Sequence, residues 1–136
     1  MRYAMIMAGG SGTRLWPMST AALPKQLIPF IDGKSLLQVA VDRLADLLPQ
    51  SRRAICAGDA HRQVITERVS GFNPERYYGE PVGRDTVNAV GLVAAVIERE
   101  DPDAVIAVFT ADHLITPVDR FVQTVERGYQ LAEARP

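Results

Sequence analysis

The chain has 136 residues, enough for one domain with a buried core and too few for two. Its 15 basic and 16 acidic side chains give a net charge of −1, which excludes a broad basic surface for nucleic acid or an anionic membrane. The chain is 47% hydrophobic and 23% charged, and we recognise neither a membrane-spanning run nor a signal peptide, so the sequence predicts a globular cytoplasmic protein.

The first half of the chain begins with a short apolar run. Residues 3–8 predict a strand that is buried on both faces. Residues 9–31 contain three prolines and three glycines without helical periodicity, and so predict an unusually long loop, which is typical of a functional segment. A helix is expected from a cap at Ser35 until Pro49 stops it.

A second strand and two more helices are predicted next. Residues 54–57 predict a strand whose Cys56, the only cysteine, is expected as a buried thiol outside any disulfide or zinc site. Asp59 is expected to cap the following helix. After a brief strand at Tyr77-Tyr78, a helical stripe of apolar residues begins near Thr86.

The last predicted strand, residues 104–109, has the strongest apolar run, and Thr116-Pro117 has the pattern of a helix start. Alternating strands and amphipathic helices predict a Rossmann-like α/β fold, a three-layer sandwich with a mostly parallel sheet, over one unit of residues 1–136. Because no strand follows the final helix, we expect the unit to be truncated.

In such a sheet, ligands bind beyond the carboxyl ends of the strands, and a glycine-rich loop follows the first strand. Its backbone N–H groups are candidates for cradling phosphate, although a plain tight turn explains the glycines equally well. Leu15 breaks the dinucleotide pattern GxGxxG, and no P-loop Lys-Ser/Thr follows. Arg14 and Lys25 favour the phosphate interpretation, since two cations on one loop can embrace a triphosphate.

Two further loops carry candidate residues. Glu80 is able to accept hydrogen bonds from a purine edge, and the alternative is a turn with helix capping by Asp85 or Thr86. Asp112, just beyond the strongest strand, is a candidate ligand for Mg²⁺, which prefers oxygen donors. His113 is expected to support or pack against that site, without a catalytic role.

These motifs resemble those of one family. Residues 7–19 together with Pro24-Lys25-Gln26 closely resemble the signature of sugar-nucleotide pyrophosphorylases, in particular mannose-1-phosphate guanylyltransferases. Residues 80–86 look like the second motif of that family and 111–113 like its third. Phe109-Thr110 stand where the family commonly has Leu-Pro, but the aspartate keeps its place.

The resemblance implies a reaction and a set of roles. Mannose-1-phosphate attacks the α-phosphorus of GTP, which yields GDP-mannose and pyrophosphate without a covalent enzyme intermediate. Arg14 and Lys25 would be catalytic by stabilising phosphate charge, and Asp112 would bind Mg²⁺. The residues implied to bind the nucleotide are Ala8, Gly9, Gly10, Ser11, Gly12, Thr13, Glu80, Gly83, Arg84 and Asp85.

The family's catalytic domain is longer than this chain, and its remaining half carries most of the sugar-phosphate site and a second metal-binding aspartate. The sequence therefore predicts a nucleotide-binding half with little activity alone, which exposes a sheet edge and is expected to form a homo-oligomer. Two alternatives stay open: a relative that transfers thymidylyl or uridylyl groups, and a non-catalytic nucleotide-binding regulatory subunit. A dinucleotide-binding oxidoreductase half is disfavoured by the absent third glycine.

Overall fold

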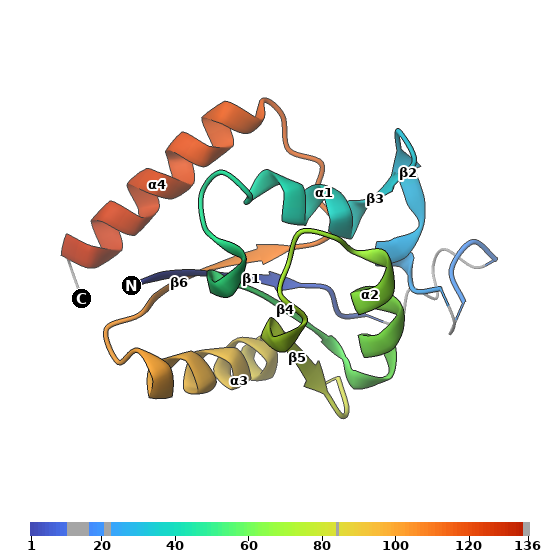
Figure 1. The fold of residues 1–136 in the computed structure, drawn as a ribbon, viewed down its shortest axis with the longest axis horizontal. Helices are drawn as coiled ribbons and strands as arrows, with labels where there is room; N and C mark the ends of the chain where they lie inside the picture. The colour runs from blue at the N-terminus through green and yellow to red at the C-terminus, as the bar shows by residue number, and fades with distance from the viewer. Residues whose placement is uncertain (11–16, 21–22, 84, 135–136) are drawn as a thin grey trace.

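The computed structural model describes residues 1–10, 17–20, 23–83 and 85–134. Its centre is a sheet of four parallel strands in the order β5-β4-β1-β6 (Figure 1). These strands are β1 (Arg2–Met7), β4 (Arg53–Gly58), β5 (Tyr77–Glu80) and β6 (Val105–Thr110). The predicted parallel sheet is therefore confirmed.

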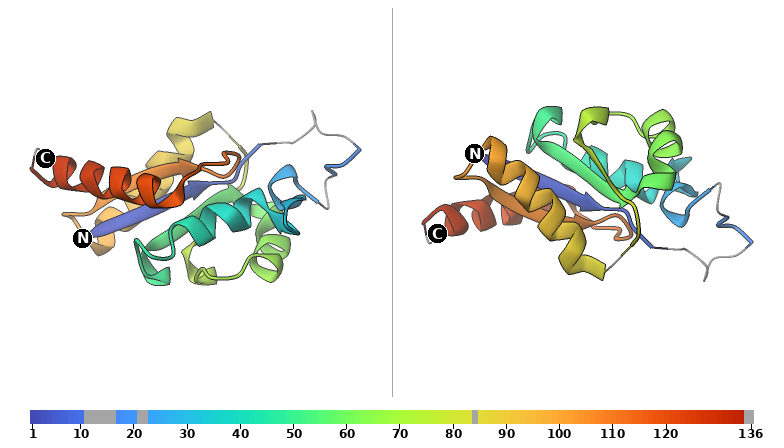
Figure 2. Two further views of the ribbon diagram at one scale, coloured as in Figure 1. Left: turned by 90° about the horizontal axis from the view of Figure 1, so that it is seen from above. Right: turned by 90° about the horizontal axis from the view of Figure 1, so that it is seen from below.

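Helices cover both faces of the sheet, which confirms the predicted three layers (Figures 1 and 2). One face carries α1 (Leu36–Arg43), α2 (Arg62–Arg68) and α4 (Val118–Ala134), and the other carries α3 (Asp85–Glu100). The chain moves from β1 outward to β5 and then crosses back to β6. Because parallel crossovers are right-handed, this reversal of direction puts α3 on the opposite face from α1 and α2.

The core lies in two clusters, one on each face of the sheet. Alternate residues of β1 contribute to both, with Ala4 and Ile6 facing α1, and Tyr3 and Met5 facing α3. The side chains of residues 3–6 are at most 4% exposed, so β1 is buried on both faces, as predicted from its unbroken apolar run. Burial of this kind is the main favourable contribution to folding.

Residues 9–31 are not free of regular structure, contrary to the expectation of one long loop. Their described part contains a 3-10 turn, η2 (Lys25–Leu27), and the strand β2 (Pro29–Ile31). β2 pairs antiparallel with β3 (Lys34–Ser35). None of these three elements shows a repeating apolar period, because each is only two or three residues long.

Two predicted helix boundaries differ in the structure. Ser35 caps α1 by accepting from the Gln38 N–H, as expected, but α1 ends at Arg43 and tight turns continue the chain to Pro49. Asp59 does not cap α2, because it lies in a 3-10 turn that precedes this helix. Its carboxylate instead accepts a hydrogen bond from the Arg62 side chain. The 3-10 turns after α1 are η3 (Gln50–Arg52), η4 (Asp59–His61) and η5 (Pro74–Arg76).

β6 forms one edge of the sheet, and α4 lies on the face to which Ala107 and Phe109 point. Val108, on the α3 face of β6, is 39% exposed, and Tyr129 is the single buried residue of the described part of α4. The Tyr129 hydroxyl donates to the Tyr3 carbonyl, which ties α4 to β1. Within the described residues β6 pairs with β1 alone, so the expected sheet edge is present there, and oligomer formation stays a prediction. Among the described residues, no helix is both long and apolar enough to span a membrane.

Candidate functional site

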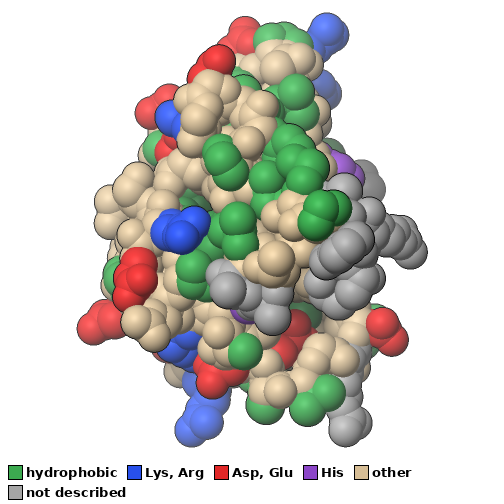
Figure 3. Space-filling view, turned by 90° about the vertical axis from the view of Figure 1, so that its right-hand side faces the viewer, with side chains coloured by type: hydrophobic (Ala, Val, Ile, Leu, Met, Phe, Trp, Pro, Cys, Tyr) green, Lys and Arg blue, Asp and Glu red, His purple; other side chains and the backbone are tan. Residues whose placement is uncertain are grey.

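A cavity of about 600 Å³ opens beyond the carboxyl ends of the parallel strands. It lies where β1 is flanked by β4 on one side and β6 on the other, the point at which the chain reverses direction. Open parallel sheets bind ligands at such a point. Figure 3 looks onto this end of the molecule, where hydrophobic side chains group in the central and upper part and most charged side chains lie to the sides and below.

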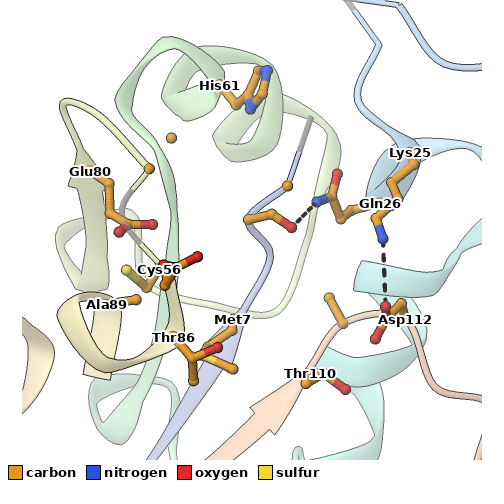
Figure 4. Close-up of a pocket in the computed structure, with 16 residues that line it drawn as sticks. Met7, Lys25, Gln26, Cys56, His61, Glu80, Thr86, Ala89, Thr110 and Asp112 are labelled. Carbon is orange, nitrogen blue, oxygen red and sulfur yellow. Dashed lines mark hydrogen bonds and ion pairs between the residues drawn. The ribbon is translucent and has the colours of Figure 1, made fainter. Parts of the chain in front are cut away.

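Lys25 and Asp112 meet at one end of the cavity (Figure 4). η2 carries Lys25, and the turn after β6 carries Asp112, so the two residues are 87 positions apart in the sequence. The Lys25 Nζ lies 3.5 Å from Asp112 Oδ2, and both side chains are partly exposed. A cation and a carboxylate thus stand side by side with access to a ligand.

The electrostatics of this end keep Asp112 ionised. Partial burial alone would raise the pKa of the carboxyl, but the Thr110 hydroxyl bonds to it and the Lys25 charge lies close. Together with a backbone hydrogen bond at Asp112 and a contribution from His113, they outweigh burial, so the pKa of Asp112 lies below its ordinary value. An ionised carboxylate is the form that binds a hard divalent cation.

The backbone that carries Asp112 is tied to α1. Arg43 is buried, and its Nη1 donates to the His113 carbonyl at 3.2 Å. Its guanidinium also lies over the ring of Phe121 in α4, 4.8 Å from the centroid. The His113 imidazole is exposed and exchanges a hydrogen bond of 3.1 Å with Thr110, consistent with a supporting position beside Asp112.

Glu80 lies at the opposite end, at the carboxyl end of β5 (Figure 4). A Cβ added to Gly9 would lie 3.8 Å from Glu80 Oε2, so Gly9 and Glu80 approach closely across the cavity floor. Cys56 lies beneath Glu80 and is 1% exposed. Burial, with a smaller contribution from the Glu80 charge, raises the pKa of this thiol to about 11. The expected buried thiol is confirmed, but it also lines the cavity.

The close approach of the Asp59 side chain to the Gly79 backbone helps to position β5 and therefore Glu80. A Cβ on Gly79 would lie 2.9 Å from the Asp59 Cβ, closer than real Cβ atoms come. Asp59 is held there by Arg62, whose Nη1 donates to the Tyr77 carbonyl at 3.1 Å. Only glycine fits at position 79 with these neighbours in place.

The structure brings together residues from all three predicted loops. Ala8 is buried beneath the cavity, and its carbonyl accepts from Gln26 rather than facing a ligand. Ser11, Gly12, Thr13, Arg14 and Arg84 lie outside the described residues. The predicted residues that line the cavity are Gly9, Gly10, Lys25, Glu80, Gly83, Asp85 and Asp112.

Several other residues that line the cavity were not predicted from the sequence. The rule that ligands bind at strand carboxyl ends points to Cys56 and Gly58 at the end of β4, and to Thr110 at the end of β6. Gln26 was given no role, although its place in the Pro-Lys-Gln motif is a signal that could have identified it. His61 and Ala89 carried no signal in the sequence, since only the fold brings α3 and the η4 turn to the cavity.

This architecture defines an α/β protein of the doubly wound class with a ligand cavity at its switch point. The model of the nucleotidyl transferase family matches residues 3–134, so the chain belongs to the nucleotidyl transferase family. This agrees with the resemblance seen in the motifs.

Individual relatives agree with that assignment. The chain is 36% identical over 136 residues to a mannose-1-phosphate guanylyltransferase of Escherichia coli K12, covering 97% of this chain and 28% of that protein. A Klebsiella pneumoniae protein of the same name is 35% identical over 135 residues, with 98% and 28% covered. The chain thus spans about 28% of the length of these curated relatives.

Solved structures share the fold. A structure titled mannose-1-phosphate geranyltransferase from Thermus thermophilus superposes with a TM-score of 0.83 at 34% identity, covering 97% of this chain and 38% of that one. One titled mannose-6-phosphate isomerase from Helicobacter pylori gives 0.75 at 21% identity, covering 98% and 47%, and shows the fold alone.

Proposed function

We propose that this chain is the nucleotide-binding part of an enzyme that makes GDP-mannose and pyrophosphate from GTP and mannose-1-phosphate. The observation that carries the proposal is the cavity shared by residues of all three motifs, above all Lys25, Glu80 and Asp112. The names of the E. coli and K. pneumoniae relatives support the choice of GTP and mannose-1-phosphate.

In this reaction a phosphate oxygen of mannose-1-phosphate forms a bond to the α-phosphorus of GTP. The bond from that phosphorus to the bridging oxygen of the β-phosphate breaks, and the electron pair leaves with pyrophosphate. Negative charge builds up on the leaving group, so a fixed cation lowers the barrier. Lys25 lines the cavity and is proposed to supply that charge together with Arg14.

A divalent cation fits the donors at the Lys25 end. The described residues hold no group of three acidic, histidine or cysteine side chains, so they form no complete metal cage. Mg²⁺ is usually held by one or two carboxylates together with substrate phosphates, and an ionised Asp112 meets that requirement. When bound there, Mg²⁺ would neutralise phosphate charge.

Glu80 is proposed to read guanine at the other end. An ionised carboxylate has only acceptors, and guanine presents two neighbouring N–H donors on one edge. Gly9 leaves the floor beside Glu80 free of a side chain. A flat base can therefore lie against the backbone while Glu80 accepts from its edge.

Thermal unfolding with added nucleotides tests the binding step. We expect GTP with Mg²⁺ to raise the melting temperature more than ATP, UTP or dTTP, because a ligand that binds only the folded state stabilises it. A larger shift with UTP or dTTP would overturn the assignment of guanine, and no shift with any of the four would overturn nucleotide binding.

The transfer step is tested in the native gene product. Pyrophosphate release from GTP should require mannose-1-phosphate. A native product that binds GTP but releases no pyrophosphate would be a nucleotide-binding regulatory subunit instead.

A further inference from the structure

We propose that Gln26 is a positioning residue that aims the backbone N–H groups of Gly9 and Gly10 at the phosphates of a bound nucleotide. This inference rests on the proposed function and adds a residue whose side chain acts through the loop. Gln26 lies in η2 beside Lys25 and lines the same cavity.

The side chain of Gln26 is fixed by two hydrogen bonds. It is 3% exposed, and its Nε2 donates to the Ala8 carbonyl at 2.6 Å and to the Gly9 carbonyl at 2.9 Å (Figure 4 shows the second). Both partners are carbonyl oxygens, which only accept, so the amide nitrogen must face them. The orientation of the amide group therefore follows from chemistry.

These bonds determine where the neighbouring N–H groups point. Within one trans peptide unit the C=O and the N–H lie on opposite sides. Since the Ala8 and Gly9 carbonyls both face Gln26, the N–H groups of Gly9 and Gly10 both face away from it. Neither N–H has a hydrogen-bond partner among the described residues. Two successive free N–H groups on one side form an anion-binding concavity.

The conformation at Gly10 supports this arrangement. Gly10 has a φ of +115°, which side chains other than hydrogen rarely allow, and a Cβ there would lie 3.9 Å from the Cε of Lys25. The Gly10 N–H and the Lys25 ammonium thus lie at the same end of the cavity, where an anion would be met by both, and the Gly9 N–H continues the floor toward Glu80.

The amide of Gln26 also carries an oxygen atom, Oε1, that an apolar side chain of similar size would lack. Its Oε1 is buried and has no hydrogen-bond partner among the described residues. Leaving a buried acceptor unpaired is costly, and methionine would fill similar space without that cost. Compared with methionine, glutamine adds the donor at Nε2, which bonds to the Ala8 and Gly9 carbonyls. This agrees with a role in holding the glycine-rich loop.

The test compares Gln26→Met with the wild-type protein and with Gln123→Glu, a control at an exposed position of α4. Binding of inorganic pyrophosphate and of GTP is measured by calorimetry. The loss of a donor that orients the loop should weaken pyrophosphate at least about tenfold in Gln26→Met, whereas the control should bind as the wild type does. Equal affinity in Gln26→Met would overturn the role of Gln26.

The amide signals of Gly9 and Gly10 provide a second measurement that needs no variant. In ¹H–¹⁵N spectra of the wild-type protein, both signals should shift on addition of pyrophosphate. Their silence while pyrophosphate binds would overturn the inference and leave the proposed function standing. If the wild type binds neither pyrophosphate nor GTP, the proposed function fails and this inference fails with it. If Gln26→Met does not fold, the two amide signals decide.

Discussion

At one end of the cavity, Lys25 and Asp112 meet through charges on side chains that are 30% and 47% exposed. At the other end, Glu80 stands above Cys56, which is 1% exposed, and beside Ala89, which is 7% exposed. The first end is held by electrostatics in contact with solvent, and the second by close packing of buried atoms.

This difference links the Lys25–Asp112 end of the cavity to function and the Glu80–Cys56 end to stability. Exposed ion pairs contribute only about 0–1 kcal/mol to folding, so the charges near Lys25 are free to serve a ligand. Buried packing resists any change of volume, so the Glu80 end has a fixed shape. We therefore expect substitutions at the first end to change chemistry and those beneath the second to change folding.

The largest effect is expected for Lys25→Met. Removing a cation from the transferring phosphates should lower the rate of pyrophosphate release in the native gene product by roughly 100-fold or more. The melting temperature should change little, because the Lys25–Asp112 pair is partly exposed. Lys34→Met is the matched control, since Lys34 pairs with Asp42 away from the cavity. A wild-type rate in Lys25→Met would remove Lys25 from the mechanism.

Gly79→Ala, in contrast to Lys25→Met, should mainly lower the stability of the fold. The added methyl group would meet Asp59 at a distance of 2.9 Å between Cβ atoms, so β5 or the Asp59–Arg62 pair must shift. We expect a loss of roughly 1–3 kcal/mol in the free energy of unfolding, measured by urea denaturation. Gly91→Ala, at an open position on α3, should instead be neutral or stabilising. Equal stability of both variants would contradict the packing described for β5.

Glu80→Gln should reduce nucleotide selectivity while the fold persists. The amide keeps the size of the side chain but replaces one acceptor with a donor, which opposes the N–H groups of guanine. The preference for GTP over ATP, measured as a ratio of dissociation constants, should fall by about tenfold. Glu98→Gln on the exposed side of α3 is the control. An unchanged ratio would exclude Glu80 from base recognition.

The smallest effect concerns the Cys56 thiol. Burial raises its pKa to about 11, so the folded protein should react slowly with a thiol reagent at pH 8, and the urea-unfolded protein quickly. Because the folded state disfavours the thiolate, the contribution of the buried Cys56 thiol to the free energy of unfolding is complete below the ordinary thiol pKa. This contribution is lost as the pH rises toward 11. Rapid labelling of folded protein at pH 8 would show that the cavity floor opens.

Much of the fold was predictable because local patterns and global packing agree. The apolar run of β1 has no polar position to face solvent, so a parallel strand buried on both faces was the natural interpretation. The carboxyl-end rule then indicated the loops that carry Glu80 and Asp112. Both loops meet in the structure at one cavity.

Other features depend on contacts that no local pattern encodes. Leu44 and Leu48 continue the apolar spacing of α1 and are buried, yet they lie in turns, because burial alone does not distinguish the two conformations. Asp59 has the composition of a cap but is engaged by Arg62. The two carbonyls bound by Gln26 become known only when the path of the glycine loop is known.

The position of β1 has a consequence for the order in which the protein assembles. β1 pairs with β6 from Arg2 opposite Val105 to Met7 opposite Thr110. About a hundred residues of sequence separate the two strands, so β1 gains this neighbour only after that length of chain has been translated. Contacts so distant in sequence slow folding. The nascent chain must hold the apolar strand β1 without this neighbour until β6 has been translated, so the Lys25–Asp112 pair forms only after β6 is in place.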